Sequence, residues 1–304
     1  MSDVNGNLPQ ALSFRERHAS AIRQWRLYVF MFKNSFSSML GLFLVVLFLL
    51  LAAIGPWIVP YPEDTLGAVN MGQRLLPPSL THLFGTDEMG ADIFSRVIVG
   101  ARTSLWIGIV ITGIAALIGV PLGIIAGYRG GIVRAAIMRV TELFLAVPGL
   151  ALALAIVASL GAGITNCVIA LSLVWWPGYV RLVESKTLAV KEELFIESAR
   201  SIGAKTPWLL WHHVLPNCLS PIIVKMSMDM GMAILAAASL GFIGLGAPPP
   251  APEWGAMISI GRSYMPDWWW YSFFPGMAIF LTVLGFNLLG DGLRDILDPR
   301  SRER

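Results

Sequence analysis

Few side chains in this sequence combine a reactive type with a spacing that supports catalysis or metal binding. His212 and His213 are adjacent, so on a helix they point in different directions and make a poor metal site. Cys167 and Cys218 are the only cysteines among the 304 residues, and neither belongs to a CxxC pair. The pattern predicts neither a metal site nor a disulfide framework.

Sequence motifs of catalysis are also missing. No Gly-Lys dipeptide occurs in the chain, although a P-loop requires one to cradle and pair phosphates. Neither the HExxH zinc motif nor the GxSxG nucleophile elbow occurs. We therefore expect a chain that has no ATPase site of its own, binds no cofactor and is not an enzyme.

Asp229 stands out because it lies inside the apolar segment of the predicted fifth transmembrane helix. An isolated carboxylate near the centre of a bilayer costs roughly 2.5 to 3.5 kcal/mol on insertion scales. Lys225 lies one helical turn before it, so an i, i+4 ion pair near an interface is one explanation. A polar contact on a solute path is the other, and we expect the structural pair.

The chain as a whole has the composition of a membrane protein. It is 56% hydrophobic and only 13% charged, whereas a soluble domain carries roughly 25% charged residues. The net charge of +3 is small, so the composition does not favour a nucleic-acid partner.

Long runs without Asp, Glu, Lys or Arg locate the membrane-spanning helices, because about 20 apolar residues cross a hydrocarbon core of about 30 Å. Five such runs occur, at 34–62, 103–128, 143–180, 230–252 and 268–290. The third is too long for one helix, and Gly161-Ala162-Gly163 interrupts it, so we divide it into two helices joined by a tight turn. The sequence predicts an all-α integral membrane protein with six transmembrane helices.

Basic residues predict the orientation, since cytoplasmic segments near helix ends are enriched in Lys and Arg. With the N-terminus inside, the outer segments keep only Arg74, Arg96, Arg102 and Arg262. We therefore place both termini in the cytoplasm. The predicted organisation is a basic cytoplasmic segment (1–38), a first transmembrane helix (39–60), an external loop (61–103), and a core domain (104–300) with helices two to six and a cytoplasmic loop (181–221).

The cytoplasmic loop contains a short amphipathic pattern. Residues 193–204 predict a helix that ends in a turn at Gly203, followed by a second helix that ends at Pro216. Small residues on the first helix would let it lie deep in a groove of a partner protein.

Six residues of this loop resemble the EAA loop of permease subunits of binding-protein-dependent ABC importers: Glu197, Ser198, Ala199, Gly203, Leu215 and Pro216. In that family the loop carries a coupling helix that inserts into a cleft of the cytoplasmic ATPase subunit. The resemblance therefore assigns ATPase coupling to these six residues. Ser198 stands where alanine is usual, and it is comparably small.

Further motifs narrow the resemblance to the C-type permease of the dipeptide/oligopeptide/nickel family. Eight residues match the external motifs of that family: Gly85, Thr86, Asp87, Gly90, Asp92, Arg96, Glu253 and Trp254. The stretch from Asn287 to Asp295, with Leu297-Asp298-Pro299-Arg300 after it, is similar to the tail of the same subunit.

The resemblance implies the fold of a type I ABC importer permease in the bacterial inner (plasma) membrane. It implies a heterodimer with a second permease subunit, two cytoplasmic ATPase subunits that use ATP and Mg, and an extracytoplasmic solute-binding protein. The lipid bilayer is the remaining partner, and no nucleic acid is expected. The implied function is to form half of the translocation path for peptides or a related solute of the dipeptide, oligopeptide, nickel or opine class.

A self-sufficient secondary transporter or channel is the alternative from another class. Such proteins carry ionisable residues at mid-membrane and a detectable internal repeat, whereas this chain offers only Asp229 and no clear duplication. A membrane enzyme has less support, because no catalytic constellation is present.

Overall fold

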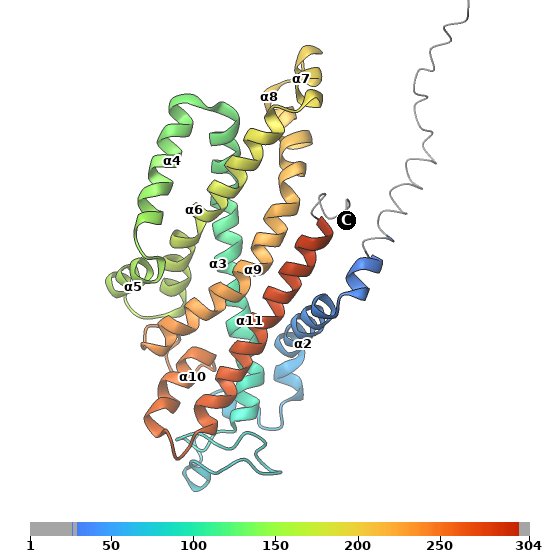
Figure 1. The fold of residues 1–304 in the computed structure, drawn as a ribbon. Helices are drawn as coiled ribbons and strands as arrows, with labels where there is room; N and C mark the ends of the chain where they lie inside the picture. The colour runs from blue at the N-terminus through green and yellow to red at the C-terminus, as the bar shows by residue number, and fades with distance from the viewer. Residues whose placement is uncertain (1–25, 27–28, 298–304) are drawn as a thin grey trace, which may run out of the picture.

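The computed structural model describes residue 26 and residues 29–297. The predicted basic segment 1–38 therefore lies mostly outside the described residues, as does the part of the tail motif beyond Leu297. The described residues are predominantly helical, and their one β-contact is an isolated bridge between Thr86 and Asp92 (Figure 1). The predicted all-α class is confirmed.

Five helical segments in the described part of the chain are long and apolar enough to cross a membrane. They are α2 (Phe36–Ile58), α3 (Ile93–Arg129), α6 (Ile164–Lys191), the segment Thr206–Phe242 that ends in α9 (Leu215–Phe242), and α11 (Trp270–Leu297). α3 begins well before its apolar run, so the helix includes Arg96 and Arg102, which the sequence pattern assigns to the external loop.

The predicted third transmembrane helix is wrong as a continuous helix. Its sequence is divided between α4 (Gly131–Ala146) and α5 (Gly149–Leu160), which are bent by 87° at the break between them. Val147 is extended there, because the ring of Pro148 disfavours helical backbone in the preceding residue. The structure holds six spans only if this bent pair crosses the membrane as one broken span.

The predicted turn between α5 and α6 is present. Gly161 and Gly163 adopt φ values of 96° and 144°, which favour glycine because it lacks a Cβ atom. The N–H of Gly163 donates to the carbonyl of Leu245 over 3.1 Å, so the turn is tied to the segment after α9.

The contact between α3 and α6 is made through a row of glycines. Gly119, Gly123 and Gly127, the glycine stripe, follow one another at intervals of four residues on one face of α3. A Cβ atom at Gly119 would lie 2.5 Å from Cβ of Tyr179, and one at Gly127 would lie 2.7 Å from Cβ of Thr187. Small residues thus let the two helix backbones approach closely, as in many membrane helix pairs.

Several connections between helices lie at two opposite ends of the protein, whereas the break between α4 and α5 lies part-way between them (Figure 1). The turn between α3 and α4 lies at one end together with α7 (Leu194–Ser201) and α8 (Thr206–Leu209), and we name this the α7 end. The opposite end holds α10 (Trp254–Gly261) and residues 61–92, which we name the cap. The segments predicted to be cytoplasmic and external are therefore separated along the helix axes.

Candidate functional site

The predicted short helix of the loop is present and is α7. The prediction that the second helix ends at Pro216 is wrong. The chain is helical from Thr206 through the π-helical turn η3 (Leu210–Val214) into α9. Pro216 lies in the first turn of α9, directly after the wider π-turn, where its missing N–H and its ring are tolerated.

One apolar side chain of α7 is buried in the protein, and Phe195 and Arg200 make further contacts with the rings of His213 and Tyr128. Ile196 is fully buried and belongs to a cluster with Val183 of α6 and Val214. Leu194 and Ile202, in contrast, expose 78% and 87% of their surface. A short amphipathic helix thus lies against the end of the bundle with apolar side chains uncovered in the single chain.

The turn after α7 is a Schellman motif. The N–H of Gly203 donates to the carbonyl of Arg200 over 2.9 Å, and the N–H of Ala204 donates to the carbonyl of Ala199 over 3.0 Å. Gly203 has φ of 83°, which glycine adopts without strain. A Cβ atom there would meet no heavy atom of this chain within 4 Å, so the conformation alone requires glycine.

The six residues of the EAA-like pattern fall in two places. Glu197 and Ser198 are exposed on α7 with Ala199 half-buried beside them, and Gly203 is exposed in the turn that follows. Leu215 and Pro216 lie in α9, where Leu215 packs against the cluster that holds Ile196. The structure therefore brings the pattern together through that cluster, with its polar part facing outward.

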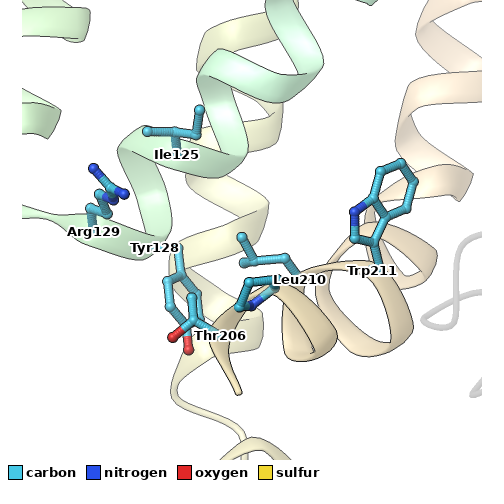
Figure 2. Close-up of a pocket in the computed structure, with 7 residues that line it drawn as sticks. Ile125, Tyr128, Arg129, Thr206, Leu210 and Trp211 are labelled. Carbon is cyan, nitrogen blue, oxygen red and sulfur yellow. The ribbon is translucent and has the colours of Figure 1, made fainter. Parts of the chain in front are cut away.

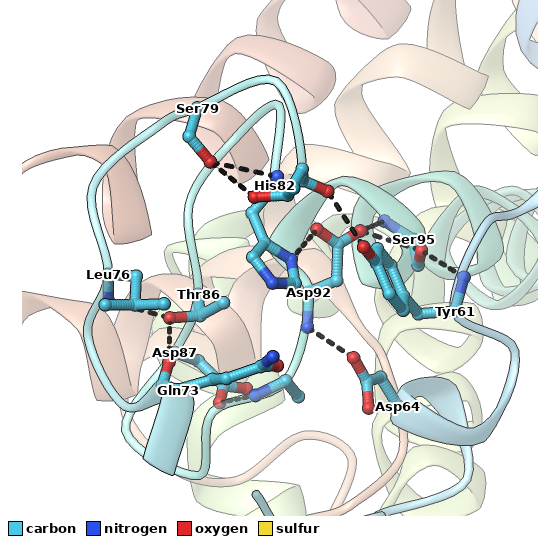
Figure 3. Close-up of polar contacts among 12 residues, drawn as sticks. Tyr61, Asp64, Gln73, Leu76, Ser79, His82, Thr86, Asp87, Asp92 and Ser95 are labelled. Atoms are coloured by element: carbon cyan, nitrogen blue, oxygen red, sulfur yellow. Dashed lines mark hydrogen bonds and ion pairs between the residues drawn. The ribbon is translucent and has the colours of Figure 1, made fainter. Parts of the chain in front are cut away.

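At the opposite end, the cap is held by side chain to backbone hydrogen bonds (Figure 3). The hydroxyl of Thr86 accepts from the N–H of Leu76 over 2.8 Å, and it donates to the carbonyl of Gln73. One carboxylate oxygen of Asp87 accepts from the N–H groups of Met89 and Ala91, over 2.9 and 2.8 Å. These bonds close the loop between residues 73 and 91 upon itself.

Two glycines of the cap have no room for a side chain. Gly85 has φ of 75°, and a Cβ atom there would lie 2.6 Å from the carbonyl oxygen of Leu76. Gly90 has φ of 80°, and its Cβ atom would lie 1.8 Å from the carbonyl oxygen of Asn70. Both positions require glycine for conformation and for space.

Asp92 joins the cap to α3 (Figure 3). One of its oxygens caps the helix by accepting from the N–H of Ser95 over 2.8 Å, and the other lies 3.0 Å from Nδ1 of His82. Its own N–H donates to the carboxylate of Asp64 over 2.8 Å. His82 also stacks on the ring of Tyr61, with centroids 4.9 Å apart. His82 and Ser95 thus satisfy both oxygens of the buried Asp92 carboxylate.

Arg96 connects the cap to the proline-rich stretch 248–252. Its Nη1 lies 3.5 Å from the carboxylate of Asp87, and its Nη2 donates to the carbonyl of Pro250 over 3.3 Å. Burial raises the pKa of Asp87 above its ordinary value, and the Arg96 guanidinium offsets part of that rise.

Glu253 and Trp254 fix the start of α10. The buried Glu253 carboxylate accepts from the N–H groups of Gly255 and Ala256, over 2.7 and 2.8 Å. Burial raises the pKa of this carboxyl, and the two N–H groups lower it by a smaller amount. Trp254 is fully buried, and its indole N–H donates to the carbonyl of Val97 over 2.9 Å. The eight external-motif residues therefore occupy structural positions in and around the cap.

Asp229 forms the expected ion pair. Its Oδ2 lies 3.1 Å from Nζ of Lys225, one turn earlier on α9, and the same Nζ lies 5.1 Å from the centroid of the Tyr179 ring. The predicted i, i+4 pair is confirmed, and it is packed against α6.

Two family descriptions match this chain. Residues 119–303, more than half of the sequence, match the binding-protein-dependent transport system inner membrane component. Residues 23–78 match the N-terminal transmembrane domain of oligopeptide transport permease C.

Relatives of known name extend the similarity over nearly the whole chain. A probable D,D-dipeptide transport system permease protein of Escherichia coli (strain K12) is 45% identical over 273 residues, which cover 90% of this chain and 91% of that protein. A dipeptide transport system permease protein of Alkalihalophilus pseudofirmus is 42% identical over 287 residues, covering 94% and 93%. A glutathione transport system permease protein of Escherichia coli O6:K15:H31 is 46% identical over 277 residues, covering 91% and 90%.

The chain belongs to the binding-protein-dependent permease family. The resemblance to its C-type subunits is confirmed. This permease is thus an inner-membrane component of an ABC transporter, and permease subunits of this family have no ATPase site, so the chain is not an enzyme.

Several residues that hold the permease together lie outside the motifs that sequence reasoning selected. Asp64, His82 and Tyr61 complete the cap network, yet each pairs with residues distant in sequence, so no periodic signal marks them. The close packing at the glycine stripe could have been predicted from the sequence, because its three glycines recur at intervals of four within an apolar run.

Proposed function

We propose that this permease forms half of the translocation path of an importer for peptides or closely related solutes, and that α7 couples the path to an ATPase subunit. The solute class is supported by the names of the relatives, which are transport system permeases for D,D-dipeptides, dipeptides and glutathione. All three solutes are short peptides or resemble them, so nickel and opines have less support. A second permease subunit completes the path, two ATPase subunits supply ATP and Mg chemistry, and a solute-binding protein delivers the solute.

The exposed apolar face of α7 is the observation that carries the coupling role. Leu194, the first residue of α7, and Ile202, its C-cap residue, are largely exposed at the end of the bundle, whereas Ile196 within the helix is fully buried. Burying two such side chains in a partner groove contributes about 1.5 to 3 kcal/mol each. The exposed Glu197 and Ser198 would then lie at the rim of that contact.

Coupling is tested by Gly203→Val with Gly130→Val as a matched control. Gly203 and Gly130 have φ of 83° and 66°, lie at the same end of the protein, and would each place a Cβ atom in open space. Each substitution imposes backbone strain on the order of 1 to 3 kcal/mol, and Gly130, with φ of 66° and ψ of −159°, lies in a region that side chains tolerate less well, so the control is at least as strained as the test variant. Only Gly203 belongs to the proposed contact, so Gly203→Val should abolish ATP-driven peptide uptake while Gly130→Val retains it.

Three measurements separate the possible causes in this test. Membrane fractions report insertion, co-purification reports ATPase retention, and uptake into proteoliposomes reports coupling. Normal insertion with lost uptake is the expected result for Gly203→Val. Wild-type uptake by Gly203→Val with the ATPase still bound would refute the coupling role of α7.

The proposed orientation places the α7 end in the cytoplasm and the cap outside. It predicts that reporter fusions at Asn70 and Arg262 read as external and that fusions at Arg134 and Lys205 read as cytoplasmic. Each site is fused separately to two reporters, an enzyme that is active only outside the cytoplasm and a fluorescent protein that is active only inside it. The two readings check each assignment independently. An external signal from Lys205 contradicts the orientation.

A further inference from the structure

A pocket of about 630 Å³ lies at the α7 end, between the last turns of α3 and the segment that follows α7 (Figure 2). Seven residues line it: Ile125, Tyr128, Arg129, Thr206, Pro207, Leu210 and Trp211. The first three come from α3 and the others from α8 and η3, so the pocket spans two segments far apart in sequence.

The polar groups of this pocket suit an anion. The Arg129 guanidinium and the Trp211 indole donate only, and the hydroxyls of Tyr128 and Thr206 can donate as well. No acidic residue lines the pocket. Arg129 makes no ion pair with any other side chain of the described ranges, and the guanidinium of Arg200 lies 5.2 Å from the Tyr128 ring centroid as a second cation nearby. The pocket thus presents positive charge without a carboxylate to neutralise it.

The remaining lining is apolar and continues toward the membrane-spanning part of α3. Ile125 lies in the apolar part of α3, one turn before Arg129 at its end, and it is 37% exposed. Trp211 is 69% exposed on the other wall. Leu210 and Trp211 belong to the π-helical turn, a rare geometry that is frequent at functional sites. An apolar chain can therefore leave the pocket along the helix while its charged end stays beside Arg129.

We propose that this pocket binds the headgroup of an anionic phospholipid of the inner leaflet. A phosphate would accept hydrogen bonds from the hydroxyls of Tyr128 and Thr206, and the Arg129 side chain, whose guanidinium points away from these hydroxyls in Figure 2, would turn toward it, while the acyl chains of the lipid would lie along Ile125 and Trp211. Basic pockets between transmembrane helices on the cytoplasmic side bind anionic headgroups in this manner, and Tyr and Trp occupy the same interfacial depth. The inner-leaflet assignment rests on the orientation given under the proposed function.

The bound headgroup would steady the segment that leaves the coupling helix. Thr206 and Pro207 begin α8 directly after the turn at Gly203. A ligand that bridges α3 and α8 restrains the position at which α7 rejoins the bundle. The lipid therefore contacts the same loop that is proposed to contact the ATPase, from the membrane side.

The test is lipid retention by the purified complex of both permeases and both ATPases, measured by native mass spectrometry. The complex is exchanged into detergent with equal amounts of phosphatidylglycerol and phosphatidylcholine. Arg129→Gln removes the pocket cation, and Arg139→Gln is the matched control. Arg139 is also an exposed arginine, in the middle of α4, and its partner is Glu142 at 3.6 Å, outside the pocket.

The wild-type and Arg139→Gln complexes should retain phosphatidylglycerol in preference to phosphatidylcholine. Arg129→Gln should lower the phosphatidylglycerol occupancy about fivefold, the factor that corresponds to about 1 kcal/mol for one basic side chain at an anionic surface. Equal retention of the two lipids by the wild type, or an unchanged preference in Arg129→Gln, overturns the proposal.

A photo-crosslinking residue in place of Trp211 distinguishes a lipid from a protein occupant. Irradiation of the complex in vesicles that contain phosphatidylglycerol should attach lipid to position 211. Attachment to an ATPase subunit instead overturns the proposal in favour of a protein contact. Neither readout requires ATP or transported solute, so failure here is distinguishable from failure of the coupling role, which appears as lost uptake with intact lipid binding.

Discussion

Replacing Gly123 by alanine tests the close packing of α3 on α6. A Cβ atom at Gly123 would lie 2.8 Å from the carbonyl oxygen of Val180 and 2.8 Å from Cβ of Val183. Neither atom is the end of a flexible side chain that can turn aside, so the helices must separate by several tenths of an ångström. Because the close approach continues along the glycine stripe, that separation weakens contacts over several turns of both helices.

The expected loss of unfolding free energy in Gly123→Ala follows from a comparison with Gly113→Ala. Gly113 lies in the same helix, and a Cβ atom there meets no heavy atom within 4 Å. Both substitutions bring the same gain in helix propensity, at most about 1 kcal/mol. The difference between them is the cost of overpacking, so Gly123→Ala should unfold with a free energy about 1 to 3 kcal/mol lower than Gly113→Ala.

Equilibrium unfolding of the two purified variants in the same detergent, titrated with a denaturing detergent, measures this difference. Helical circular dichroism reports the transition, and the wild type provides the reference. Gly113→Ala should match or exceed the wild type in stability. Equal unfolding free energies for the two variants, or a more stable Gly123→Ala, would refute the argument that glycine is required for the α3–α6 contact.

The remaining predictions concern ionisable groups. Asp229→Asn removes the charge opposite Lys225 and should lower the unfolding free energy by roughly 1 to 2 kcal/mol, between the values for exposed and buried pairs. The pattern of peptides that compete for uptake should stay unchanged, and an altered pattern at normal expression would place Asp229 on the solute path. Burial raises the pKa of Glu253 above its ordinary value of 4.5, so the folded state binds this proton more tightly than the unfolded state. The protonated Glu253 carboxyl therefore contributes fully to the free energy of unfolding at a pH below 4.5. This contribution declines as the pH rises through the pKa of the folded state. Thermal unfolding across this range should show that decline in the wild type and not in Glu253→Gln, and an identical pH profile in the variant would contradict the assignment.

The apolar runs identified three membrane-spanning helices, α2, α3 and α11, because the length needed to cross a bilayer is a property of one segment. The run at 230–252, in contrast, overlaps only the last part of the helical segment 206–242. The positive φ at Gly203 was foreseeable, since a turn that ends a short helix is a local event. The ion pair of Lys225 and Asp229 was also accessible, because an i, i+4 spacing brings the two side chains together on any helix.

The bend between α4 and α5 shows where local reasoning fails. Pro148 lies within the third apolar run, but the sequence of that run does not distinguish a mild kink from a break of 87°. Pro216 led to the opposite error. It was predicted to end a helix, but it lies directly after a π-turn that accommodates it, and the helix continues. In both cases the neighbouring backbone decides the effect of the proline ring.

The sequence by itself determined the helical class, the approximate positions of several spans and the family, each of which depends on the order of residues within separate local segments. Only the tertiary structure decided which face of α3 meets α6, how the cap satisfies its buried carboxylates, and that α3 and α8 enclose a pocket lined by Arg129. These features join residues far apart in the chain. Their geometry depends on how close two backbones approach, and that distance is set by the packing of both partners together.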